Sequence, residues 1–273
     1  MALFPMHVWL PNAYTYAPTA FSRVVAPLMT KVMVYVMVRL MISVFGLDYI
    51  FNHLHLAEAV VWLGTIAILA GGVMALSQKN LKKMLAYIIV CEIGYMVGGA
   101  WMGNTLGMTG AILHILNDAL MTFVLFLAVG NMVYRIEKVE LTDLQGMFGK
   151  MPWTMGAFVV AAFSIVGVPP TCGFFSKWYL ILAAIEAGAW HFAAALIISS
   201  LICAVLFFKV FEICFFEPKA EGHGDHHHGP APVAMAEAPV SMLIVSTIAS
   251  ASLIVVGLYS GTIVNTIILP FLK

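Results

Sequence analysis

Charged residues and cysteines are both scarce in this chain, and each shortage excludes a class of protein. Only 10% of the 273 residues are charged, against roughly 25% in a soluble domain. The formal net charge is zero, which favours neither a nucleic-acid partner nor an acidic one. The cysteines are far apart and form no CxxC pair, so packing is favoured over a disulfide or metal site. No iron–sulfur or haem motif is present, so no cofactor is expected. The cysteines are Cys91, Cys172, Cys203 and Cys214.

Apolar residues, in contrast, make up 62% of the chain. About 20 consecutive apolar residues cross a bilayer as a helix. The apolar runs predict an all-α integral membrane protein with about seven transmembrane helices, the fifth of them interrupted. The predicted spans are Ala17–Phe45, Ala57–Ser77, Leu81–Trp101, Leu106–Tyr134, Trp153–Ala187, Trp190–Phe216 and Pro239–Ile268.

The remaining segments divide the chain into four parts. Residues 1–16 are expected to form a short N-terminal half-helix (Met1–Trp9) and a cytoplasmic turn (Pro11–Pro18). Residues 17–216 hold a transmembrane core of six spans. Residues 217–238 form a His-rich cytoplasmic loop, and residues 239–273 form a C-terminal transmembrane helix.

Lysine and arginine in the connections predict the orientation, because cytoplasmic loops carry an excess of both. One side holds only Arg39 and Lys273. The other side is therefore predicted to be cytoplasmic and the C-terminus to lie outside, in a bacterial or archaeal cytoplasmic membrane. The cytoplasmic set is Lys79, Lys82, Lys83, Arg135, Lys138, Lys150 and Lys219.

The interrupted fifth run carries a lysine just after its break. The break is Gly167–Pro170, and Lys177 follows it. In a bilayer, a helix break persists only where protein or a wet cavity satisfies the freed backbone groups. An ionisable residue beside such a break marks an ion pathway, and broken helices recur in ion-coupled transporters. This segment indicates a chain that moves a cation, most simply a proton.

Five ionisable residues lie well inside the apolar runs: Lys31, Glu92, His114, Asp118 and Lys177. His114 and Asp118 are four residues apart and share one helix face. Satisfied core ions are the alternative interpretation, but charged groups in a bilayer are costly and usually functional. Their spread over separate spans favours a chain of proton-accepting sites, in which histidine titrates near neutral pH.

Two further groups are weaker candidates. Lys209 and Glu212 are three residues apart and form either a proton uptake point or a lysine paired with its helical neighbour. The histidines of the loop could bind a transition metal weakly, although a solvated loop is the favoured interpretation because no spacing fixes a geometry. These histidines are His223, His226, His227 and His228.

Several motifs resemble the antiporter-like subunits of respiratory complex I, the large subunits of Mrp-type cation/proton antiporters and membrane-bound hydrogenases. The matches keep the family's order and extend to about residue 216, and Ser176–Tyr179 is most similar to the Mrp D-type branch. The matching segments are Phe4–Ala13, Ala17–Ala20, Leu28–Val32, Gln78–Tyr87, Ile93–Met96, Gly167–Pro170 and Gly173–Lys177.

The resemblance implies two inverted five-helix repeats, each with one broken helix, around a polar axis along the membrane. Lys31 matches the lysine that links the two half-channels, His114 the histidine between them, and Lys177 the terminal lysine of the second half-channel. Three positions depart from the family: Asp118 replaces a second histidine, Thr122 a lysine, and Glu92 a neutral residue or histidine. These departures rearrange the charges of the polar axis.

The resemblance also implies that the chain holds only the second repeat, as the C-terminal half of a split subunit. We then expect other membrane subunits as partners, including a chain that supplies the N-terminal half, and lipid but no nucleic acid. The leading hypothesis is a proton-translocating subunit of a complex I-like or Mrp-like assembly, itself without redox chemistry. The alternatives are Na⁺/H⁺ antiport, a structural scaffold without conduction, and a quinone-site subunit near His7 and Trp9.

Overall fold

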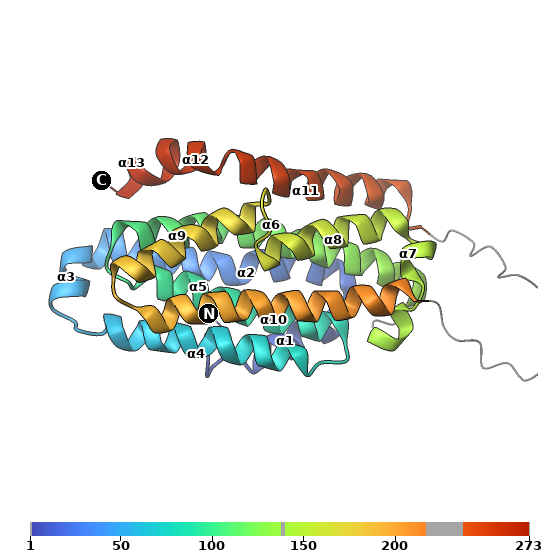
Figure 1. Cartoon of the computed structure of the whole chain (residues 1–273), viewed down its shortest axis with the longest axis horizontal. Coiled ribbons are helices and arrows are strands. Elements are labelled where there is room, and N and C mark those ends of the chain that lie inside the picture. Colours follow the sequence, from blue (N-terminus) through green and yellow to red (C-terminus); the bar gives the residue numbers. More distant parts are fainter. Residues whose placement is uncertain (1, 138–139, 217–236, 273) are drawn as a thin grey trace, which may run out of the picture.

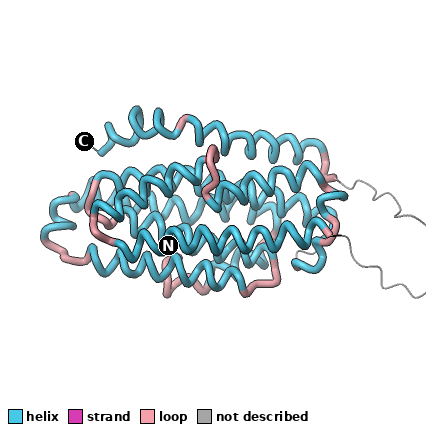
Figure 2. The backbone as a smooth tube through the Cα atoms, viewed as in Figure 1, coloured by secondary structure: helices cyan, strands magenta, loops and turns pink. Residues whose placement is uncertain are grey.

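This computed structural model describes residues 2–137, 140–216 and 237–272. Every regular element in these residues is a helix (Figure 2). The long helices run side by side along one direction (Figure 1). Six of them are long and apolar enough to cross a membrane. With the shorter pair α8 and α9, these six agree with the seven predicted spans. The principal helices are α1 (Trp9–Tyr16), α2 (Thr19–Leu40, continued by a π-helix to Phe45), α3 (Leu47–Asn52), α4 (Ala57–Leu76), α5 (Leu81–Ala100), α6 (Thr105–Ile136), α7 (Met147–Lys150), α8 (Pro152–Val166), α9 (Cys172–Glu186), α10 (Trp190–Phe215), α11 (Val240–Leu258), α12 (Ser260–Ile263) and α13 (Leu269–Leu272).

Helix α5 lies at the centre of the bundle, and nearly all of its residues are buried. Glycines let it approach α4 closely: a Cβ on Gly64 would lie 3.0 Å from the Cα of Gly98, and one on Gly71 would lie 2.7 Å from the nitrogen of Cys91. Small residues at helix contacts are how membrane helices gain packing, since lipid is as apolar as their side chains. Asn80 caps the start of α5 by accepting a hydrogen bond from the Lys83 amide at 3.1 Å.

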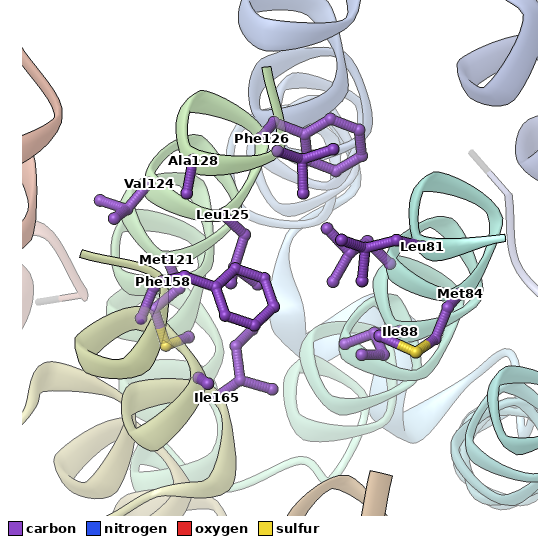
Figure 3. Packing of buried hydrophobic residues seen from close by; sticks show 14 of the residues in the cluster. Leu81, Met84, Ile88, Met121, Val124, Leu125, Phe126, Ala128, Phe158 and Ile165 are labelled. Carbon is purple, nitrogen blue, oxygen red and sulfur yellow. The ribbon is translucent and has the colours of Figure 1, made fainter. Parts of the chain in front are cut away.

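Another face of α5 packs against α6, and side chains of α8 join the same apolar core. Figure 3 shows this apolar core. Leu81, Met84 and Ile88 of α5 face Leu125 and Phe126 of α6, with side chains of α8 below them. This packing holds fixed the two helices that carry three of the predicted charged residues.

The predicted break at Gly167–Pro170 separates α8 from α9. Gly167 has φ +93°, a left-handed conformation that costs glycine little, and its amide closes α8 onto the Phe163 carbonyl at 3.0 Å. Pro169 and Pro170 have no amide hydrogen to continue a helix. A side chain replaces one of the lost backbone bonds: the Ser164 hydroxyl accepts from the Gly173 amide, at the start of α9, at 3.2 Å.

Helix α11 packs directly on the broken segment, beside the loop that rises between α8 and α9 (Figure 1). A Cβ on Gly257 would lie 2.2 Å from the Pro170 carbonyl oxygen. We therefore expect Gly257→Ala to destabilise the protein by about 1–3 kcal/mol, as overpacking does. Gly261→Ala is the matched control, since nothing lies within 4 Å of its Cβ position. Thermal unfolding in detergent measures both, and equal midpoints would contradict this packing.

The N-terminal prediction was wrong in detail. Residues 2–8 are not helical, and the segment expected to be a turn after Pro11 is instead α1. Pro11 is the third residue of this helix, where its missing amide hydrogen is not needed. Residues 2–8 lie about midway along the length of the bundle (Figure 1).

The C-terminal span also differs from the single helix predicted over Pro239–Ile268. Helix α11 ends at Leu258, and a second short apolar stretch runs from Ser260 to Leu272. The 19 residues of α11 already span about 28 Å at 1.5 Å per residue. Helix α11 is therefore long enough to cross the apolar part of a bilayer without the residues after Leu258. Before α11, the Glu237 carboxylate accepts a hydrogen bond from the Trp153 amide at 2.7 Å and so caps α8.

Candidate functional site: a buried polar chain

Lys31 and Asp118 form a buried ion pair between α2 and α6. Lys31 Nζ lies 3.0 Å from Asp118 Oδ2, and both side chains are almost completely buried. Thr122, one helical turn after Asp118, connects them a second time. Its hydroxyl accepts from Lys31 at 3.2 Å and donates to Asp118 Oδ1 at 2.8 Å. Pro27 lies four residues before Lys31, but α2 continues through it.

His114 and Glu92 form the second buried pair, between α6 and α5. His114 Nε2 lies 2.5 Å from Glu92 Oε2, and neither side chain is exposed. His114 Nδ1 lies 2.8 Å from the Ser176 hydroxyl of α9. Because Ser176 donates its own hydrogen to the Gly173 carbonyl at 3.3 Å, it accepts from Nδ1–H. His114 Nε2 and Glu92 then share one proton. Either Glu92 is a neutral acid beside a neutral imidazole, or Glu92 is a carboxylate beside an imidazolium.

The two pairs are adjacent on α6. His114 and Asp118 are one helical turn apart, which places their Cβ atoms about 5–6 Å from each other. Each is bonded to a group on a different helix: Asp118 to α2, His114 to α5 and α9. The arrangement brings acid, base and hydroxyl groups of four helices into one buried cluster.

Lys177 completes the cluster on α9. Its Nζ donates to the Ile165 carbonyl at 2.5 Å, a group freed by the helix break, and to the Ser200 hydroxyl of α10 at 3.2 Å. It also lies 4.9 Å from the centroid of the Tyr95 ring. The same ring contacts the His114 ring, with centroids 5.3 Å apart. Tyr95 thus lies between Lys177 and His114.

All five charged residues predicted inside the spans are buried, at 4% exposure or less. The sequence did not identify the neutral groups that connect them, which are Ser176, Ser200, Tyr95 and the Ile165 carbonyl. A partial signal was available for Ser176, since it precedes Lys177 in the chain. The role of Thr122 could not be read from the sequence either, because it depends on Lys31, 91 positions away.

The weaker candidates lie elsewhere. Lys209 and Glu212 are both exposed near the end of α10, and the ion pairs found among the described residues do not join them. The four histidines of the loop, which begin at His223, fall outside the described residues. Within the described residues, no group of three histidine, cysteine or acidic side chains is arranged to hold a metal ion.

An open apolar cavity of about 330 Å³ lies beside Lys31, between α2 and α6. Leu28, Val32 and Tyr35 line it from α2, and Phe271 lines it near the C-terminus. The same face of α2 is largely uncovered: Leu28, Val32 and Tyr35 are each about half exposed. Lys31 lies between this face and the buried face of α2: it lines the edge of the cavity, yet its side chain is buried.

The Lys31–Asp118 pair predicts a specific pattern of stabilities. Removing one partner of a buried pair leaves an uncompensated charge and costs about 3–5 kcal/mol. Lys31→Met and Asp118→Asn should therefore each destabilise the protein, whereas the charge-balanced double variant should be more stable than either single variant. Thermal unfolding in detergent tests this order. Additive losses in the double variant would mean that the two side chains do not pair.

Comparison with known proteins identifies a sequence profile that matches residues 1–203, described as NADH:quinone oxidoreductase/Mrp antiporter, TM. The NADH-quinone oxidoreductase subunit N of Desulforudis audaxviator is 40% identical over 272 residues, which are 98% of this chain and 54% of that protein. The D-type subunit of the Na(+)/H(+) antiporter of Alkalihalophilus pseudofirmus is 32% identical over 214 residues, 78% of this chain and 43% of that protein. The chain spans about half the length of these relatives.

Solved structures show the same fold. A chain of the Mrp complex from a Dietzia species superimposes with a TM-score of 0.85 at 24% identity, covering 96% of this chain and 55% of that one. A chain of the archaeal membrane-bound sulfane sulfur reductase superimposes with a TM-score of 0.82 at 26% identity, covering 96% of this chain and 51% of that one. Together, the matching profile, the shared fold and the apolar helices make this chain an integral membrane protein.

Proposed function

We propose, from the premise that this chain belongs to the NADH:quinone oxidoreductase/Mrp antiporter membrane family, that it conducts protons through its buried polar cluster as a subunit of a larger membrane complex. The observation that carries the proposal is the pair of acid–base contacts one turn apart on α6. Each contact joins a proton donor to an acceptor at 2.5–3.0 Å, within the range in which a proton can transfer directly.

The proposed path runs from Lys31 to Lys177 through the α6 residues. Lys31 exchanges a proton with Asp118, and Thr122 holds both in place. The step along α6 to His114 spans one helical turn, which a water molecule can bridge in a polar site. His114 then exchanges its Nε2 proton with Glu92, and its Nδ1 side leads through Ser176 to the helix that carries Lys177.

The irregular backbone at the N-terminal end supports a partner at this face. Residues 2–8 lie midway along the bundle without helical hydrogen bonds, and lipid cannot satisfy such backbone groups. The uncovered face of α2 and the apolar cavity beside Lys31 are also open to a partner. We propose that protein covers the exposed face of α2 in the assembled complex and continues the polar path beyond Lys31.

The proposed orientation follows from the positive-inside rule. The α4–α5 turn and the segment after α6 lie together, since the Leu141 amide bonds the Lys79 carbonyl at 2.8 Å. The end of α10 joins them, because the Gly146 amide bonds the Phe216 carbonyl at 2.9 Å. The lysine-rich connections thus gather at one end of the bundle, which we assign to the cytoplasm of a bacterial or archaeal inner membrane, with the C-terminus outside.

Na⁺/H⁺ antiport is the second candidate function, favoured by the similarity to a Na(+)/H(+) antiporter component. Proton conduction and Na⁺/H⁺ antiport are distinguished by measuring internal pH and ²²Na⁺ uptake together in proteoliposomes that contain the whole complex. Proton flux that is unchanged when Na⁺ is replaced by choline supports the proposal. Flux that requires Na⁺ on the opposite side favours antiport, and no flux of either ion favours a structural scaffold.

A further inference from the structure

Lys177 is a buried cation whose contacts are all with neutral groups. Its side chain is 4% exposed, and the ion pairs among the described residues do not include it. An ammonium has three N–H donors. The Ile165 carbonyl and the Ser200 hydroxyl accept two of them, and the ring of Tyr95 lies 4.9 Å from Nζ. Three acceptors therefore surround three donors, an arrangement that suits the protonated form.

The Tyr95 ring is itself held in a fixed position. Its hydroxyl lies 2.6 Å from the Ser199 hydroxyl. Ser199 donates its only hydrogen to the Leu196 carbonyl at 2.9 Å, so Tyr95 is the donor in the contact between the two hydroxyls. The ring is completely buried, and it meets the His114 ring at an interplanar angle of 63°. One aromatic side chain thus contacts both proposed proton carriers and is anchored to α10.

We propose that Tyr95 is a positioning residue, whose ring face holds the Lys177 ammonium beside His114 in place of a carboxylate counterion. A cation within about 6 Å of a ring centroid is attracted by the electron density of the ring face, more strongly when both are desolvated. This contact differs from the Lys31–Asp118 pair, because a ring face attracts the ammonium without accepting its proton. The inference rests on the proposed proton path, and it gives Tyr95 a role in the part of that path that contains Lys177.

The test is a series of variants at position 95 in the assembled complex, with proton flux measured in proteoliposomes. Tyr95→Phe keeps the ring and removes the hydroxyl, and Ser199 still donates to Leu196. We expect its flux to stay within about twofold of the native protein. Tyr95→Leu removes the ring, and we expect a loss of about thirtyfold, the rate equivalent of a desolvated cation–π contact.

Fluorinated phenylalanines at position 95 distinguish attraction by the ring from simple space filling. Successive fluorines withdraw electron density from the ring face while nearly preserving its shape. A stepwise fall in flux from phenylalanine to trifluorophenylalanine supports the inference, and this series remains informative if Tyr95→Leu does not assemble. Equal flux along the series, or native flux in Tyr95→Leu, would overturn it. Lys177→Met distinguishes failure of the proposed proton path from failure of the role of Tyr95. If Lys177→Met leaves proton flux unchanged, the proposed path is wrong. If Lys177→Met loses flux but Tyr95→Leu keeps native flux, only the role of Tyr95 is rejected.

Discussion

Replacing Lys177 with methionine is expected to abolish proton transport while leaving the complex assembled. Methionine keeps most of the side-chain length and removes the ammonium, so the step between His114 and the far end of the path loses its proton carrier. The folded protein tolerates the change because Lys177 bonds only neutral groups, and no charge is left unpaired. Proton flux in proteoliposomes, with native gel electrophoresis for assembly, measures both effects.

A surface lysine provides the control for this variant. Lys79 lies exposed in the turn between α4 and α5, outside the buried cluster. Lys79→Met should retain native flux, since only a solvated charge is lost. Native flux in Lys177→Met would exclude Lys177 as a proton carrier and would leave the broken helix without a role in transport.

His114→Asn is expected to lower proton flux about a hundredfold or more, the scale of removing a positioned acid–base group. Asparagine can place its amide nitrogen near the position of Nδ1 and still donate to Ser176, which keeps the contact between α6 and α9, but it is too short to reach Glu92. It cannot exchange a proton at neutral pH. The path would then be interrupted between Asp118 and Lys177, with the charged residues on either side unchanged.

His191 offers a matched histidine control. It stacks on Trp62 with ring centroids 3.9 Å apart, at the start of α10 and away from the cluster. His191→Asn should therefore leave flux near the native value. Equal losses in both variants would indicate a general effect of replacing a histidine, and unimpaired flux in His114→Asn would show that protons bypass α6.

The helices could be predicted from the sequence because the bilayer imposes length and composition on each span. The break at Gly167–Pro170 was equally visible, since glycine and two prolines act locally. The end of α11 at Leu258 was not, because no proline marks it and apolar residues continue beyond it. The N-terminal error had the opposite cause: Pro11 signals a turn, yet it is compatible with the first turn of α1.

For the candidate site, the sequence identified which residues are buried charges but could not pair them. Glu92 and His114 are 22 positions apart, on separate helices, and their contact depends on how α5 and α6 are rotated. The partners of Lys177 were beyond prediction for another reason. A backbone carbonyl and an aromatic face have no sequence signature as cation acceptors, and only their position around Nζ gives them that role.

The most direct measurement of the central claim is proton flux through the complex that carries Lys31→Met together with Asp118→Asn. This double variant removes the acid–base pair without leaving a buried charge, so the protein should fold and assemble. If protons cross through the cluster, flux should fall to the background of empty proteoliposomes. Native flux in the assembled double variant would contradict the account, because it would show that the buried charges are structural and that protons do not pass through them.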